Sequence, residues 1–178
     1  MKDLTEHFVA GGMVFDGNLL KVYRDAVRLP DGSQGEREYI RHPGAVAIVA
    51  LTEDRRLLLE RQYRYPPRRE FIEIPAGKID PGEAHFATAK RELLEETGYV
   101  AQEWTRLCVL HTAISYTDEA IELYLARKLT LQERKLDPGE FLETFLLPFD
   151  DALAMVRDGR ISDVKTVAAI LWVKAFLP

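Results

Sequence analysis

The sequence has little of several features that would assign a protein class at once. It contains a single cysteine, Cys108, which excludes an internal disulfide framework and favours a reducing compartment. No apolar run approaches the roughly 20 residues that a membrane-spanning helix needs. The longest runs, Gly44–Leu51 and Thr166–Val173, have eight residues each, and the N-terminal residues lack the apolar core of a signal peptide. We therefore expect a soluble, cytoplasmic protein with no membrane partner.

An excess of basic residues is also missing. The chain has 24 Lys and Arg residues against 29 Asp and Glu residues, a formal net charge of −5. A net acidic chain is a poor candidate for sequence-independent binding to nucleic acid, so we expect no nucleic-acid partner. What is present is a hydrophobic share of 47% in 178 residues, without internal repeats or low-complexity segments. This suits one domain with a sizeable core, with or without a small appendage.

The two parts of the chain differ in their patterning. Residues 1–43 predict short β-strands separated by turns, such as Asp16-Gly17-Asn18. A few hairpins of this size cannot stand alone, so they must pack on the rest of the chain or on a second subunit. We place a boundary there and expect an N-terminal antiparallel β appendage (1–43) before a larger domain (44–178).

The hydrophobic pattern of the larger domain predicts an α/β fold class. Its expected strands are Ala45–Leu51, Arg56–Gln62, Phe71–Ile74, Trp104–His111, Ile121–Ala126 and Phe141–Leu147, and its closing helices are Asp150–Asp158 and Asp163–Phe176, with Ser162 as the N-cap of the last. Strands, one helix, then more strands and helices indicate a mixed sheet with helices packed on it.

A helix with well-marked ends follows a glycine loop. Asp80 is placed to cap it, Pro81 suits its first position, and Gly98 suits its C-terminal stop, which predicts a helix over 81–97. At about 100° per residue, Glu92, Glu95 and Glu96 fall within roughly a 100° arc of this helix.

Three carboxylates on one helix face repel one another. Glu92 and Glu96, spaced four residues apart, cost about 0.2–0.5 kcal/mol even on a wet surface. A divalent cation such as Mg²⁺, which prefers oxygen ligands, would turn this repulsion into binding. The charges alone are equally typical of a solvated acidic face.

The flanking residues carry a more specific pattern. Glycine, five residues, glutamate, seven residues, then Arg-Glu-Leu-x-Glu-Glu-x-Gly resembles the box of the Nudix hydrolase family. The matching positions are Gly77, Glu83, Arg91, Glu92, Leu93, Glu95, Glu96 and Gly98. The resemblance implies an α/β/α sandwich and a Mg²⁺ or Mn²⁺ site. It also implies that Glu92, Glu95, Glu96 and the main-chain carbonyl of Ala76 bind the metal, with Arg91 pairing structurally to the box carboxylates.

Segments before the box narrow the resemblance. The 61–66 segment Arg-Gln-Tyr-Arg-Tyr-Pro, the 73–77 segment Glu-Ile-Pro-Ala-Gly and the appendage are similar to the ADP-ribose pyrophosphatase branch. That branch exchanges its appendage across a homodimer. It implies substrate contacts from Arg64, Arg61 and Glu73, although each could instead be a surface charge or a paired carboxylate. A guanidinium at Arg64 suits a bidentate phosphate contact.

The base that activates water lies on a late loop in this branch. Here residues 136–143 form that loop, and Glu140 best fits the position, ahead of Glu143 and of Glu95 within the box. The alternative for Glu140 is a solvated loop glutamate. A mobile acidic loop containing proline and glycine suits a lid that closes on substrate.

One segment departs from the branch. A proline that usually follows a serine after the box is absent from residues 113–119, Ala-Ile-Ser-Tyr-Thr-Asp-Glu, which end at the further substrate-binding candidate Glu119. We therefore expect hydrolysis of ADP-ribose or another nucleoside diphosphate sugar, with GDP-mannose as a competing substrate. Two rivals stay open, a non-catalytic nucleotide sensor and a hydrolase that removes mutagenic nucleoside triphosphates.

Overall fold

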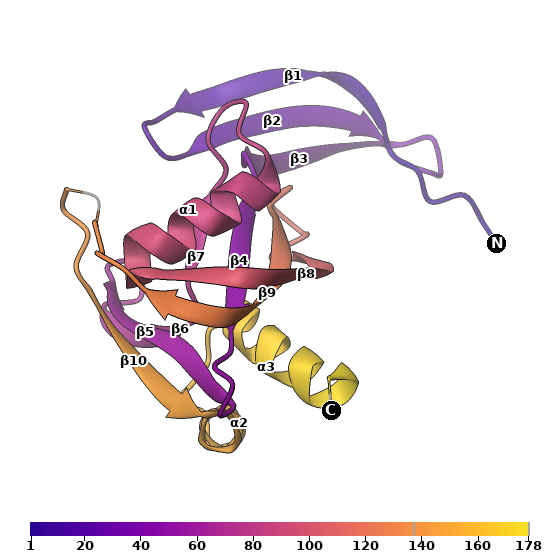
Figure 1. Ribbon diagram of the computed structural model, residues 1–178. Helices are drawn as coiled ribbons and strands as arrows, with labels where there is room; N and C mark the ends of the chain where they lie inside the picture. The colour runs from indigo at the N-terminus through magenta and orange to yellow at the C-terminus, as the bar shows by residue number, and fades with distance from the viewer. Residues whose placement is uncertain (137, 178) are drawn as a thin grey trace. The chain divides into compact units, whose positions relative to one another are not determined.

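The computed structural model describes residues 1–136 and 138–177, in two compact units. The first unit combines Met1–Gly44 with His111–Ala120, and the second combines Ala45–Leu110 with the residues from Ile121 onward. Three β-sheets and three helices make up the described chain (Figure 1). None of these helices has the combined length and apolar character that spanning a bilayer requires.

The first unit is built on an antiparallel sheet in the order β1-β2-β3. These strands are β1 (His7–Asp16), β2 (Lys21–Arg28) and β3 (Gln34–Arg41). The predicted turn at Gly17 joins β1 to β2, where the Gly17 amide donates to the Leu20 carbonyl at 2.9 Å. Tyr23 and Tyr39 stack across β2 and β3 with ring centroids 5.5 Å apart. Many apolar side chains of this sheet remain exposed, including Phe8 at 66% and Phe15 at 56%.

The second unit holds two sheets. One has the order β7-β4-β9-β8 and the other has the order β10-β5-β6. The strands are β4 (Ala45–Ala50), β5 (Arg56–Arg64), β6 (Arg69–Glu73), β7 (Ala76–Lys78), β8 (Tyr99–His111), β9 (Ala120–Leu131) and β10 (Leu142–Pro148). β4 runs parallel to β9 and antiparallel to β7, so the larger sheet is mixed.

Strand β4 explains the layered architecture. Every residue of β4 is buried, because its alternating side chains enter two different apolar clusters. Val46 and Ile48 pack with Leu93 of α1 (His85–Thr97). Ala47 and Val49 enter the cluster that contains α2 (Phe149–Arg157) and α3 (Val164–Phe176). Helices on both faces of a sheet require a continuous apolar run, and the expected α/β/α sandwich is confirmed (Figure 1).

Four local predictions are wrong. Helix α1 begins at His85 instead of Pro81, because Gly82 has φ +80° and cannot extend a right-handed helix. Its N-cap is Ala84, without a side-chain cap, in place of Asp80. The N-cap of α3 is Asp163 instead of Ser162, and its carboxylate accepts from the Thr166 amide at 3.0 Å. The segment read as a glycine loop contains strand β7.

Candidate metal centre and active site

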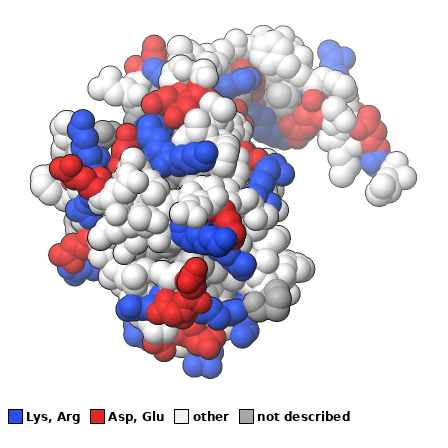
Figure 2. Space-filling model, viewed as in Figure 1, with Lys and Arg blue, Asp and Glu red and all other residues white. Residues whose placement is uncertain are grey.

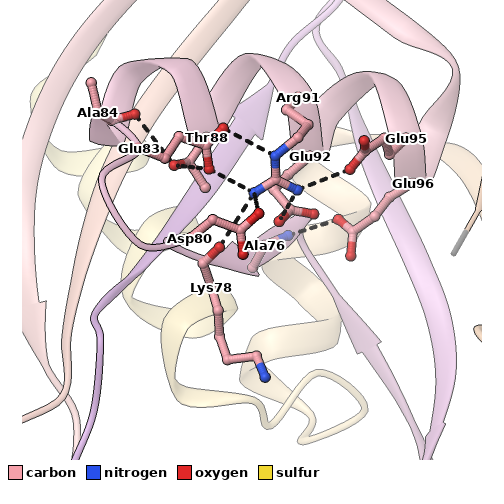
Figure 3. A network of polar contacts seen from close by, with 10 residues as sticks. All are labelled: Ala76, Lys78, Asp80, Glu83, Ala84, Thr88, Arg91, Glu92, Glu95 and Glu96. Atoms are coloured by element: carbon pink, nitrogen blue, oxygen red, sulfur yellow. Dashed lines mark hydrogen bonds and ion pairs between the residues drawn. The ribbon is translucent and has the colours of Figure 1, made fainter.

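The site begins where strand β7 lies against helix α1. β7 pairs with β4 through Ala76 opposite Ala47 and Gly77 opposite Val46. The Ala76 amide donates to Oε2 of Glu96 at 3.0 Å, which ties the C-terminal half of α1 to this strand (Figure 3). The two segments that the sequence singled out are therefore brought together by tertiary contact.

Gly77 makes the close approach possible. A Cβ added to Gly77 would lie 1.9 Å from Cδ of Glu92 and 2.0 Å from its Oε1. Any larger residue would push the Glu92 carboxylate away from β7. The glycine of the box pattern therefore leaves room for a carboxylate, and its own backbone is not in the left-handed region.

Arg91 organises the first half of the site. Its guanidinium donates to both carboxylate oxygens of Glu83, with Nη2 to Oε2 at 2.8 Å, and from Nη1 to Glu92 at 2.8 Å and Glu95 at 2.9 Å (Figure 3). The hydrogen bonds from Arg91 and Thr88 lower the pKa of Glu83 to about 2. The expected structural pairing of Arg91 with the box carboxylates is present, and it draws Glu83 out of the first turn of the helix.

Two carboxylates are buried without such compensation. Glu96 is 5% exposed and Glu60, on β5, is 3% exposed. Burial raises the pKa of each well above its usual range. The charges of Glu140 and Glu73 raise the pKa of Glu60 further, and those of Glu60, Glu92 and Glu140 raise the pKa of Glu96 further. Oε1 of Glu60 has no hydrogen-bond partner among the described residues.

Glu60 is the residue that sequence reasoning missed. A signal for it existed in the strand pattern. Side chains alternate along a strand, so Glu60 shares a face with Leu58, which is buried in the predicted core strand. A carboxylate on the apolar face of a buried strand is unusual enough to mark a candidate.

The donor set fits a divalent cation. Within residues 1–136 and 138–177, no three His, Cys, Asp or Glu side chains already converge at metal-binding geometry. The reason is visible in Figure 3: Glu92 and Glu95 turn toward Arg91, and Glu96 is bonded to the Ala76 amide. Carboxylate oxygens are nevertheless available, namely the unpartnered oxygen of Glu60 and those of Glu92, which lies in the space beside Gly77. Such oxygens are the ligands that Mg²⁺ and Mn²⁺ prefer.

A second ionic network lies on the adjacent sheet. Glu73, at the end of β6, is 4% exposed and receives a bidentate pair from Arg64, with distances of 2.7 Å and 2.9 Å. Lys165 of α3 also donates to Glu73, and its own ammonium contacts Asp163 at 3.1 Å. Although burial raises it, these two cations hold the pKa of Glu73 below its usual value. Glu73 therefore has the contacts of a carboxylate paired within the protein, which is the alternative to a substrate contact given for it above.

Arg61 of β5 and Glu143 of β10 lie on the opposite face of their sheet from Glu60. Arg61 donates to Glu143 at 2.7 Å and to Glu70 at 3.1 Å, and the Glu143 side chain is 72% exposed. β5 and β10 pair Arg61 directly with Glu143, one residue along from Glu60. Because adjacent strand residues point to opposite faces, neither side chain shares the face of Glu60.

Glu140 and Glu119 fall in different units. Glu140 is half-buried, and its carboxylate contributes to the raised pKa values of Glu60, Glu92 and Glu96, so it belongs to the same electrostatic cluster. Asp137, in the same predicted loop, lies outside the described residues. Glu119 belongs to the first unit, where it accepts from the Thr112 hydroxyl at 2.6 Å.

The sandwich, the box helix and the carboxylate cluster define a class. Residues 41–169 match the family described as the NUDIX domain, and the chain belongs to that family. Residues 13–40 match the nucleoside diphosphate sugar hydrolase N-terminal domain. The chain is a Nudix hydrolase by sequence, in agreement with the resemblance of its box.

Particular relatives narrow the class further. The chain is 39% identical over 176 residues to a Bacillus subtilis protein named ADP-ribose pyrophosphatase, covering 98% of this chain and 95% of the relative. It is 40% identical over 175 residues to a Bacillus methanolicus protein named methanol dehydrogenase activator, covering 97% and 95%. A Yersinia enterocolitica protein named GDP-mannose pyrophosphatase is 31% identical over 138 residues, 72% of each chain. The crystal structure of an ADP compounds hydrolase superposes with a TM-score of 0.89 at 27% identity, covering 99% of this chain and 97% of that one.

Proposed function

We propose that the chain is a divalent-metal-dependent pyrophosphohydrolase that splits ADP-ribose or a related nucleoside diphosphate sugar. The products would be a nucleoside monophosphate and a sugar phosphate. The observation that carries this proposal is the buried carboxylate cluster between β7, α1 and β5, in a chain whose full length aligns with an ADP-ribose pyrophosphatase. A buried cluster of like charges is costly to fold, which argues for a cationic ligand.

The residues divide into roles. Glu92, Glu95, Glu96 and the Ala76 carbonyl are the proposed ligands of Mg²⁺ or Mn²⁺. When bound, such a cation neutralises the diphosphate and makes its phosphorus more electrophilic. Arg91 holds Glu92 and Glu95 near this position until a stronger positive charge competes for them. Glu95 also remains a candidate base.

Glu140 is the proposed general base that takes the proton from the attacking water. The proposal is supported by the proximity of Glu140 to the buried carboxylates. Glu143 is exposed and lies on the other face of the sheet, away from these carboxylates. Proton transfer by a positioned side chain contributes about 10²–10⁴-fold to rate. We therefore expect Glu140→Gln to lower kcat by about 10²–10⁴-fold with Mn²⁺ affinity kept. Glu143→Gln is the matched control and should retain turnover.

That comparison is made by steady-state kinetics with calorimetric Mn²⁺ titration of each variant. Unchanged turnover in Glu140→Gln would move the role to Glu143 or to Glu95.

Arg64 and Glu73 are proposed to contact the substrate as an ion pair, the arginine through phosphate and the carboxylate through a ribose hydroxyl. Arg61 and Glu119 complete the proposed substrate-binding set.

The substrate is tested with a panel of compounds. ADP-ribose, GDP-mannose, ADP-glucose, dinucleoside polyphosphates and nucleoside triphosphates are each incubated with Mg²⁺ and with Mn²⁺, and the products are identified. Fastest cleavage of ADP-ribose supports the leading proposal, and GDP-mannose is the alternative. A preference for nucleoside triphosphates would instead support removal of mutagenic nucleotides.

A regulatory role is the second candidate function. The relative from Bacillus methanolicus carries the name of a methanol dehydrogenase activator, which is the observation in its favour. A sensor of this kind would bind a nucleotide sugar without cleaving it. Absence of products across the panel, together with tight binding of ADP-ribose, would favour this candidate over the enzyme.

A second copy of the chain is the proposed partner. The 1–43 appendage and the 44–178 hydrolase domain are the proposed division, supported by the separate matches to residues 13–40 and 41–169. Exposed apolar side chains on the appendage sheet, such as Phe8 and Phe15, support a homodimer in which that sheet is covered. Light scattering should give twice the chain mass, and a fully active monomer would refute the dimer.

The location and the absence of a nucleic-acid partner are proposed from the amino-acid composition. We propose a cytoplasmic location on the single cysteine, and no nucleic-acid partner on the net negative charge. On the face shown in Figure 2, basic and acidic side chains are interspersed, and neither sign forms a broad continuous surface.

A further inference from the structure

One carboxylate in the described chain has a buried oxygen atom without a hydrogen-bond partner. Oε1 of Glu60 is the one buried side-chain nitrogen or oxygen in residues 1–136 and 138–177 that has no hydrogen-bond partner. The residue is 3% exposed in the middle of the β10-β5-β6 sheet. Leaving an ionised carboxylate unpaired in such a place costs several kcal/mol, so the position calls for a partner.

Other carboxylates of low exposure in the same unit have hydrogen-bond donors around them. Glu122 accepts from His85, Arg106 and Tyr124, and its side chain is 12% exposed. Glu73 accepts from Arg64 and Lys165. The fold thus supplies donors to its low-exposure carboxylates, and Glu60 is the exception.

The neighbours of Glu60 supply too little positive charge. Across the strands it faces Glu73 and Thr144. The two nearby cations, Arg64 and Lys165, have their hydrogen bonds to Glu73. Its remaining charged neighbours include Glu96 and Glu140, which are acids. Either retained protons or a bound cation must therefore balance this group of carboxylates, and a cation that binds there displaces the protons.

We propose that Glu60 is an additional metal-binding residue, which strand β5 contributes from outside the box helix to bind a divalent cation together with Glu96. This inference rests on the proposed function, because the cation is the one that hydrolysis requires. The cation would link β5 to α1, two elements that the box sequence does not connect. The fold would then leave Glu60 without a protein donor because its partner is the metal.

The test is calorimetric titration of the full-length, EDTA-treated chain with Mn²⁺ alone. Glu60→Gln keeps the side-chain shape and removes the charge, and Glu103→Gln makes the same change on an exposed side chain of the same unit, paired with Lys128. We expect Glu60→Gln to bind Mn²⁺ at least about tenfold more weakly, or with fewer ions per chain. Its Mn²⁺-induced rise in melting temperature should shrink in parallel, while Glu103→Gln behaves as the unmodified chain does.

The outcomes separate this inference from the proposed function. Mn²⁺ affinity and stoichiometry that are unchanged in Glu60→Gln but lost in Glu96→Gln would overturn the role of Glu60 and leave the hydrolase proposal standing. No Mn²⁺ uptake by the unmodified chain, even with ADP-ribose present, would refute the proposed function itself. If Glu60→Gln does not fold, Glu60→Val, which suits a buried strand, replaces it under the same criteria.

Discussion

The two ends of helix α1 hold carboxylates in opposite conditions. Before the first turn, Glu83 accepts hydrogen bonds from Arg91 and Thr88, and its pKa is lowered to about 2. Toward the last turn, Glu96 is buried beside Glu60, and the pKa of each is raised. A satisfied charge stabilises the fold, whereas a buried and under-compensated charge persists at the expense of stability. The difference supports our proposal that the C-terminal end of the helix binds the metal ion.

The largest effect should come from the under-compensated end. Glu96→Gln should lower kcat/KM for ADP-ribose with Mg²⁺ at least about 100-fold, since even groups that only support a metal ligand cost 10–100-fold. Removing a buried charge should leave the melting temperature of the metal-free protein unchanged or higher. Steady-state kinetics and thermal melts test both points, with Glu83→Gln as the matched change at the other end. Turnover within threefold of the unmodified chain would contradict the prediction.

The satisfied end should dominate stability instead. Arg91→Ala leaves Glu83, Glu92 and Glu95 without their shared donor, and we expect a loss of about 2–4 kcal/mol in the free energy of unfolding. Urea denaturation of the metal-free protein measures it. Arg160→Ala, which removes an exposed pair with Asp158, is the control and should cost at most about 1 kcal/mol. Equal losses in the two variants would show that the Arg91 network is not a stabilising centre.

The pH dependence follows from the raised pKa values of Glu60 and Glu96. The folded protein keeps protons that the unfolded chain releases above about pH 4.5, so the stability of the metal-free protein falls as pH rises through this window. We expect the melting temperature in EDTA to drop by roughly 4–8 °C between about pH 6 and pH 9, the response to about 2 kcal/mol.

A divalent cation replaces those protons, so Mg²⁺ should raise the melting temperature more at the higher pH. The doubly substituted Glu60→Gln, Glu96→Gln protein is the control and should lose most of the pH dependence. A melting temperature that rises from pH 6 to pH 9 in EDTA would show that these carboxyl groups are not protonated in the folded state.

Substitutions of two glycines should have smaller effects, one on stability and the other on metal binding. Gly98 ends α1 at φ +76°, and a Cβ there would lie 3.0 Å from the Gln132 carbonyl oxygen, so Gly98→Ala should cost about 1 kcal/mol of stability. Gly77→Ala should instead displace the Glu92 carboxylate and weaken Mn²⁺ binding about tenfold. Thermal melts and calorimetry on both variants test the pair. A reversal of the two effects would contradict the assignment.

Local signals in the sequence predicted one end of α1 well and the other badly. Gly98 stops the helix where expected, because a left-handed C-terminal residue is a local property of glycine. The start was misplaced because Glu83 is drawn to Arg91, eight residues further along, and Gly82 takes a positive φ. A capping pattern cannot reveal that competition.

The site residues were likewise predicted from the sequence only in part. The spacing of Glu92, Glu95 and Glu96 placed them on one helix, and the comparisons support the family that this spacing suggested. Glu60 was missed because its significance depends on a neighbour 36 positions away in the chain. Arg61 and Arg64 were both substrate-binding candidates, with Arg64 preferred, and of the two it is Arg64 that forms the bidentate pair with buried Glu73.

The sequence by itself determined the family, the box helix, the buried strands and the residue types that suit a divalent cation, because each depends on spacing along a short segment. Only the tertiary structure decided which carboxylates are buried and which of them are paired. Burial and pairing depend on side chains from β5, β6, β7, α1 and α3 meeting in space, and the order of residues along the chain does not contain those distances.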